Sequence, residues 1–218
     1  MCMIKIQICM GNNLNTNIAQ TMPDVREEDQ LRADMYSFIA NMIRTEPSQE
    51  LIDSVKSLSG DSSSIGSSIK LISKLASTLH ISEIQQEYVN LFLGVGRGEL
   101  LPFASYYLTG FLNDKPLSKL RDDMNKLGVV RLKEVKEPED HVSSLFDIMA
   151  GLITGQFGKV YSISEQSDFF EKHLNSWVHL LMSDIESAKT AVFYAPIGSL
   201  GKEFINIERE AFRMNISG

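Results

Sequence analysis

Apolar residues along this chain recur mostly at intervals of three and four, the spacing that puts side chains on one face of an α-helix. The first such run spans Leu31 to Ile43, opens near Pro23-Asp24 and ends at Glu46-Pro47, because the residue before a proline disfavours helical geometry. Alternating strand patterns and hairpin signals are absent. The sequence therefore predicts an all-α protein with one mostly helical domain, whose later helical runs cover residues 51–58, 65–79, 82–92, 106–112, 116–127, 138–152, 166–181, 183–196 and 200–212.

Three of the predicted boundaries depend on particular residues. Ser82 stands three residues before Gln85, which is the spacing of a capping box. Pro138 suits the first position of a helix, where its missing N–H costs nothing. The apolar residues between Phe169 and Leu181 share one side, so residues 166–181 are predicted to form one continuous helix.

Composition narrows the classes of protein that fit. The 218 residues are 43% hydrophobic and 22% charged, as in an ordinary globular protein. A net charge of −7 argues against nucleic acid or anionic membrane as a partner, since both need clustered lysine and arginine. We expect residues 1–22, which include Cys2 and Cys9, to form a flexible extension without a signal-peptide pattern, and residues 23–218 to form the helical domain of a cytoplasmic protein.

Motifs for catalysis or metal binding are missing. The glycine-rich segment Gly94–Gly98 lacks the phosphate-loop pattern and follows a helix instead of a strand, so we interpret it as a hinge that ends that helix. His173 and His179 are six residues apart and lie on different helix faces, which disfavours a metal pair. No catalytic residue, metal or cofactor is expected.

Two segments have unusual side chains. Glu137–His141 combines a proline with several acids, which is ordinary helix-start chemistry but also a patch able to hold a partner's arginine or lysine. Its carboxylates are expected to favour the charged form of His141. Leu100–Tyr107 is an aromatic-rich connection, which either packs in the core or forms a groove for an apolar peptide.

The order of these segments resembles the TorD/DmsD/NarJ family, cytoplasmic chaperones that mature molybdenum-containing redox enzymes. Glu87–Phe92 is similar to the family's E-Y-x-x-L-F helix, and it precedes the glycine-rich break. Pro102–Tyr107 resembles its P-Y-E-S-x-Y stretch, and Glu137–His141 resembles its E-P-D-H signature. Phe169–Trp177 is similar to its F-x-x-x-H-L-x-x-W pattern. The similarity extends over residues 30–212 in matching order.

This resemblance implies an orthogonal bundle of the TorD-like type and no enzymatic activity. The client would be the precursor of a molybdenum-containing oxidoreductase, bound through its twin-arginine signal peptide or another segment until the cofactor is inserted. Either a monomer or a dimer that exchanges helices at residues 133–137 would fit. The implied peptide-binding residues are Phe92, Phe103, Ser105, Tyr106, Glu137, Pro138, Glu139, Asp140 and His141.

Other functions stay open at this point. A helical adaptor that binds a folded partner would need no preference for arginine-containing peptides. A nucleotide hydrolase using His141 with Asp140 would need a phosphate cradle, which Gly94–Gly98 provides poorly. A purely structural pair at Asp140 and His141 is a further interpretation.

Overall fold

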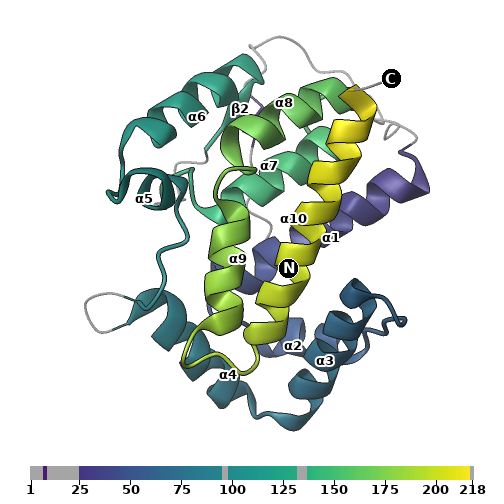
Figure 1. Ribbon diagram of the computed structural model, residues 1–218, viewed down its shortest axis with the longest axis vertical. Coiled ribbons are helices and arrows are strands. Elements are labelled where there is room, and N and C mark those ends of the chain that lie inside the picture. Colours follow the sequence, from purple (N-terminus) through teal and green to yellow (C-terminus); the bar gives the residue numbers. More distant parts are fainter. Residues whose placement is uncertain (1–6, 9–24, 95–97, 132–136, 217–218) are drawn as a thin grey trace, which may run out of the picture.

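The computed structural model describes residues 7–8, 25–94, 98–131 and 137–216, and most of this part of the chain is helical (Figure 1). The all-α prediction is confirmed. A π-helical turn, η1 (Val89–Leu93), continues the fourth helix. The α-helices are α1 (Glu27–Arg44), α2 (Gln49–Lys56), α3 (Ser64–Thr78), α4 (Ile81–Tyr88), α5 (Ala104–Thr109), α6 (Lys115–Lys126), α7 (Val142–Thr154), α8 (Ile163–His173), α9 (Val178–Ser187) and α10 (Ala195–Ile216).

A minimal β-ladder joins two distant segments. Strand β1 (Gln7–Ile8) pairs antiparallel with β2 (Val129–Val130), with Ile8 opposite Val129. Segments of two residues are too short to show an alternating pattern, so the sequence did not predict them. Residues 1–6 and 9–22 of the predicted extension lie outside the described residues.

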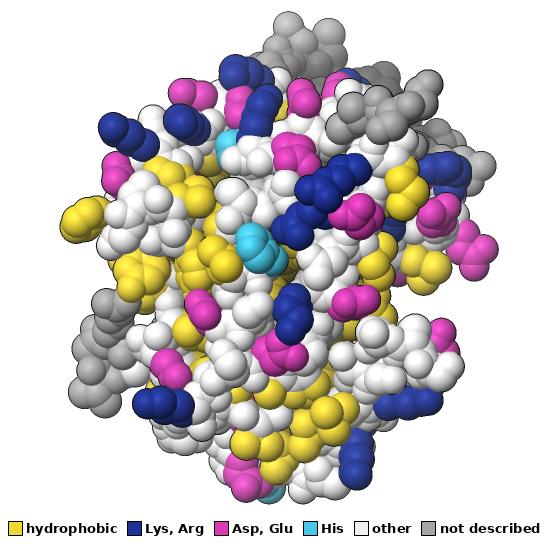
Figure 2. Space-filling view, in the orientation of Figure 1, with side chains coloured by type: hydrophobic (Ala, Val, Ile, Leu, Met, Phe, Trp, Pro, Cys, Tyr) yellow, Lys and Arg dark blue, Asp and Glu magenta, His cyan; other side chains and the backbone are white. Residues whose placement is uncertain are grey.

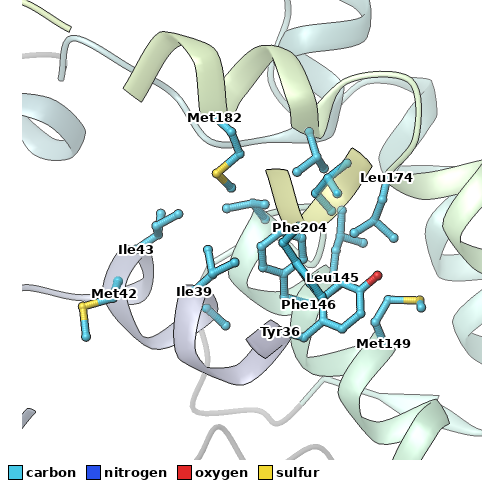
Figure 3. Packing of buried hydrophobic residues seen from close by; sticks show 14 of the residues in the cluster. Tyr36, Ile39, Met42, Ile43, Leu145, Phe146, Met149, Leu174, Met182 and Phe204 are labelled. Atoms are coloured by element: carbon cyan, nitrogen blue, oxygen red, sulfur yellow. The ribbon is translucent and has the colours of Figure 1, made fainter. Parts of the chain in front are cut away.

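The core is built around α1 and α7, which form the most extensive helix pair. Figure 3 shows Tyr36 and Ile39 of α1 facing Phe146 of α7 and Phe204 of α10. The ring of Tyr36 lies edge-on to Phe146 at 5.3 Å and to Phe204 at 4.7 Å between centroids. Helix α10 crosses the molecule beside α9 (Figure 1). Within the described ranges, no helix is both long and apolar enough to traverse a bilayer.

The predicted capping box at the start of α4 is wrong by two residues. The cap is His80, whose ring nitrogen accepts from the Ser82 N–H, while the Glu83 carboxylate accepts from the His80 N–H at 2.7 Å. Gln85 instead donates to the carbonyl of Pro47, between α1 and α2. A ring nitrogen can act as the acceptor in place of a hydroxyl, so the same capping chemistry begins two residues earlier than predicted.

The prediction of one helix over residues 166–181 is also wrong, because α8 ends at His173 and α9 begins at Val178. The break lets Trp177 sit fully buried, with its indole N–H donating to the His173 carbonyl at 2.7 Å. Arg209 of α10 donates to the carbonyl of Asn175 at 3.1 Å. A side chain of another helix therefore donates to a backbone carbonyl at the break. A local sequence pattern cannot reveal such a distant partner.

Two further boundaries differ from the prediction. Pro138 does not begin α7, which starts at Val142 with His141 as its cap. The predicted helix over residues 183–196 stops at Ser187, and a loop leads to α10 at Ala195. In that loop the Glu87 carboxylate of α4 accepts the N–H groups of three successive residues, Val192, Phe193 and Tyr194.

Candidate functional site

The fold brings together the two unusual segments of the sequence. Phe103 and His141 form an antiparallel β-bridge, and their rings meet edge-on at 5.0 Å between centroids. The Ala104 N–H donates to the Asp140 carbonyl at 3.0 Å, and the Val142 N–H donates to the Pro102 carbonyl at 2.8 Å. The starts of α5 and α7 are thereby held side by side.

Asp140 is the centre of this junction, with 1% of its surface exposed. Its Oδ2 accepts the backbone N–H of Ser105 at 2.8 Å, at the start of α5. Its Oδ1 is buried and has no hydrogen-bond partner, and the same holds for the Ser105 hydroxyl. A buried carboxylate oxygen without a donor is costly, so it marks a place where a ligand cation or water would be favourable.

The unpartnered atoms are not scattered through the fold. Over the described ranges, four buried side-chain atoms lack a hydrogen-bond partner, and all lie at the start of α7 or on residues that contact it. Besides those of Asp140 and Ser105, they are the Ser143 hydroxyl oxygen and Arg44 Nε. Arg44 pairs with Asp147 of α7 through its Nη2. Two of the four residues, Asp140 and Ser105, belong to the two segments that the sequence singled out.

His141 is neutral, and the prediction of a charged imidazole is wrong. Its Nδ1 accepts the Ser143 N–H at 3.2 Å, so that nitrogen carries no proton. Burial, followed by the positive charge of Arg44, lowers the pKa of His141 to about 3. The carboxylate of Asp140 accepts from the Ser105 N–H instead of facing the ring, and the negative charge of Glu139 is paired with Arg121.

Glu139 is already paired within the protein. Its carboxylate accepts from Arg121 of α6 at 3.0 and 2.7 Å and lies 3.4 Å from Arg131. These arginines hold the pKa of Glu139 below its usual value, although burial acts against them as the largest single effect. The side chain that was expected to receive a partner's guanidinium thus binds two of the protein's own.

The remaining predicted site residues lie around or away from this junction. Glu137 is exposed, and its carbonyl accepts from Arg131, while the half-buried Pro138 accepts the His141 N–H. Tyr106 is half-buried beside Tyr107. Phe92 is not brought to the junction, since its ring packs in the core against Tyr88 at 5.1 Å and Tyr194 at 5.5 Å.

A pocket of about 440 Å³ opens beside Asp140, between α5, α6, α7 and α8. Its lining is mixed, with apolar and charged side chains in close proximity. The apolar residues are Ala104, Leu108, Pro116, Leu120 and Leu145. The polar residues are Lys119, Asp122, Asp123, Lys126, Asp140, Lys172 and His173, so three carboxylates balance three lysines.

His173 enters the pocket from α8, and sequence spacing alone did not identify it as part of the site. Its Nε2 lies 3.0 Å from the Asp123 carboxylate of α6, fifty positions away in the chain. Burial lowers the pKa of His173 more than Asp123 raises it, so the ring is neutral and donates its N–H to Asp123. Among the described residues, no group of three or more metal-ligating side chains is arranged to hold a metal ion.

The neutral state of His141 predicts a dependence of stability on pH, which His141→Asn would remove. Below pH 6.5 the unfolded histidine takes up a proton that the folded one, with a pKa of about 3, does not. Lowering the pH therefore favours the unfolded state. At about pH 5 the penalty is roughly 2 kcal/mol. Urea unfolding of both proteins at about pH 7.5 and about pH 5 should show that the free energy of unfolding falls by this amount more in the original protein than in the variant.

The titration of Asp147 changes stability with pH in the opposite direction. Its contribution is the same in both proteins, so it cancels when they are compared. Burial raises its pKa from 3.8 to about 6, so the folded state gains stability as the pH falls through that range in both proteins. Asparagine keeps an acceptor for the Ser143 N–H and so preserves the helix cap. A difference between the two proteins that is the same at both pH values would mean that folded His141 protonates normally.

Comparison with known proteins gives consistent results. A sequence profile described as the nitrate reductase delta subunit matches residues 60–183. The chaperone protein TorD of Vibrio atlanticus is 26% identical over 212 residues, covering 87% of this chain and 98% of that protein. TorD of Vibrio cholerae is 26% identical over 208 residues, covering 86% and 94%.

The fold has a solved counterpart. A crystal structure described as that of a candidate redox enzyme maturation protein from Archaeoglobus fulgidus superposes with a TM-score of 0.51. The superposition covers 87% of this chain and 99% of the Archaeoglobus chain, at 17% sequence identity. At that identity the likeness establishes a shared helical fold, in agreement with the predicted bundle.

Proposed function

Since this chain belongs to the nitrate reductase delta subunit family, we propose that it is a maturation chaperone for a molybdenum-containing redox enzyme. In this proposal it binds the N-terminal region of the precursor, a twin-arginine signal peptide, in the cytoplasm. It holds the precursor until the cofactor is inserted, and only then does export proceed. The relatives named as TorD chaperones, which match over most of their length, support a chaperone in preference to an enzyme.

The observation that carries the peptide-binding part is the buried, unpartnered Oδ1 of Asp140 beside the pocket. A guanidinium group is planar, permanently charged and weakly hydrated, so it can enter a partly apolar pocket at a lower cost than an ammonium group. One of its N–H groups would satisfy Oδ1.

Replacing Asp140 by asparagine tests this contact. The amide oxygen still accepts the Ser105 N–H, while the amide N–H₂ group presents donors to an incoming cation. Isothermal titration with a twin-arginine peptide should show affinity reduced by about tenfold or more, since a charge-assisted hydrogen bond is lost. A twin-lysine peptide should bind the original protein similarly weakly.

Glu137→Gln is the matched control, because Glu137 is exposed and absent from the pocket lining. It removes the same charge three residues away and should leave the affinity unchanged. Equal binding of arginine and lysine peptides, or equal effects of both substitutions, would contradict the proposed role of Asp140. No binding of either peptide by the folded protein would favour a helical adaptor, whose partner would then be sought among folded proteins.

A further inference from the structure

Glu139, the neighbour of Asp140 in the chain, already holds an arginine of the protein itself. Arg121 of α6 donates to one oxygen of the Glu139 carboxylate, Oε2, from its Nε at 3.0 Å and from its Nη2 at 2.7 Å. The other oxygen lies 3.4 Å from Nε of Arg131. In the free protein, a guanidinium group from outside therefore finds this carboxylate occupied.

The ion pair between Arg121 and Glu139 lies at the edge of the pocket that contains Asp140. Arg121 stands between Leu120 and Asp122 in the chain, and both of these residues line the pocket. The hydrogen bond to Glu139 is the main cause that raises the pKa of Arg121, and the negative charge of Asp140 contributes in the same direction. One guanidinium group therefore lies within electrostatic reach of two adjacent carboxylates.

This ion pair has the properties of an exchangeable contact. Half of the Arg121 side chain is exposed, so its guanidinium group can be rehydrated at a low cost. Both of its N–H groups reach the same oxygen, which is less favourable than the parallel arrangement in which each carboxylate oxygen accepts one. Glu139, by contrast, has only 11% of its side chain exposed and needs a cationic partner. A guanidinium group from outside can take the place of Arg121 and leave the carboxylate paired.

The helix that carries Arg121 does not attract cationic ligands in general. The sequence of α6 contains four cationic residues and two acidic ones. Figure 2 shows basic side chains, in dark blue, interspersed with acidic ones over this helix, at the upper left of the molecule. Because the helix carries more positive than negative charge, long-range attraction does not select a cationic peptide here. Selection has to come from direct pairing with individual carboxylates, of which Glu139 is one.

We propose that Arg121 is an internal competitor of the client: it holds Glu139 in the free protein, and one arginine of the client's arginine pair displaces it. This inference rests on the proposed function, in which the other arginine pairs with Asp140. Adjacent carboxylates suit adjacent guanidinium groups, and a lysine cannot form the parallel bonds that favour the exchange. Arg121 is therefore a specificity-determining residue, since a ligand with only one arginine leaves the internal pair intact.

Arg121→Gln tests the competition by isothermal titration in roughly 0.15 M salt. The variant should bind the twin-arginine peptide about fivefold more tightly, because binding no longer breaks an internal ion pair. A peptide in which glutamine replaces one of the two arginines should bind the variant and the original protein alike. Arg121→Lys keeps the charge without the planar fork and should show a smaller gain in the same direction, and it carries the comparison if the glutamine variant does not fold.

Two further proteins locate the effect. Lys115→Gln removes the same charge from the exposed start of α6, outside the pocket lining, and should leave the affinity unchanged. In a Glu139→Gln background the carboxylate that Arg121 occupies is absent, so Arg121→Gln should no longer raise the affinity for the twin-arginine peptide. Circular dichroism checks that each variant is folded before it is titrated.

The results separate this inference from the proposed function. Equal or weaker binding of the twin-arginine peptide by Arg121→Gln would mean that Arg121 only stabilises the fold, and the inference is wrong. An equal gain for a twin-lysine peptide, or a gain that persists in the Glu139→Gln background, would mean that Arg121 acts through its charge at a distance, which also overturns it. In these cases a loss of affinity in Asp140→Asn keeps the proposed function. If the original protein and the variants bind no peptide, the proposed function is wrong and the inference with it.

Discussion

Replacing Glu87 by alanine is expected to lower the free energy of unfolding by about 4 kcal/mol, one of the two largest effects we predict for this protein. The Glu87 side chain is buried, and its Oε1 accepts the N–H groups of Val192 at 2.8 Å and Tyr194 at 2.7 Å. Its Oε2 accepts the N–H of Phe193 at 3.0 Å. Alanine would leave three donors unpaired just before α10.

The position of this carboxylate explains the size of the effect. Hydrogen bonds to a charged acceptor contribute more than neutral ones, and the N-terminus of a long helix favours a negative charge. Glu87 also connects α4 to the loop between α9 and α10, which are far apart in the chain. Its loss therefore affects the packing of α10 as well as the local hydrogen bonds.

Urea unfolding followed by circular dichroism would measure the effect. Gln86→Ala is the matched control, because Gln86 is the exposed neighbour on the same helix and its side chain donates to the exposed Asn90. It should change stability by less than about 0.5 kcal/mol. Glu87→Gln keeps one acceptor oxygen and should be intermediate, so a graded value is available even if the alanine variant does not fold. Similar losses for Glu87→Ala and Gln86→Ala would contradict this role.

The second large effect is expected for Glu208→Leu, which should cost about 4 kcal/mol. Glu208 of α10 is 1% exposed, and its two oxygens accept from Arg32 of α1 at 2.7 and 2.8 Å. The Tyr36 hydroxyl donates to the same carboxylate at 2.9 Å. Leucine would remove the acceptor of Arg32 Nε and Nη2 and of the buried Tyr36 hydroxyl, and Arg32 would keep only the bonds of its Nη1 to Asp29 and Gln166 among those of the described residues.

A double variant separates the ion pair from simple packing. Arg32→Met together with Glu208→Leu replaces the pair by apolar groups of similar length, and such replacements often recover most of the lost stability. We expect the double variant to lie within about 1.5 kcal/mol of the original protein, measured by urea unfolding of all four members of the cycle. Losses that simply add would show that Arg32 and Glu208 are not energetically coupled.

Much of the fold followed from local sequence. The three- and four-residue spacing predicted the all-α class, and it located α1, α3 and α6 because each of these helices has one buried face that is continuous in the chain. The Glu46-Pro47 pair and Gly128 correctly marked helix ends, because their backbone preferences act within one or two residues. The segment Glu137–His141, which the sequence singled out, contains the buried Asp140, whose Oδ1 has no hydrogen-bond partner among the described residues.

The tertiary structure decided how those elements and charges are used. The bridge between Phe103 and His141, the pairing of Asp123 with His173, and the acceptance of the Tyr194 N–H by Glu87 join positions that are tens of residues apart. The charge of His141 depends on its burial and on Arg44 from another helix, and Glu139 is bound by Arg121 from a third. Periodicity reports which face of a helix is buried, because that is set by neighbours within one turn. It does not report which distant groups meet that face. Those groups fix the pKa of a buried side chain, and their arrangement decides that Oδ1 of Asp140 has no partner among the described residues.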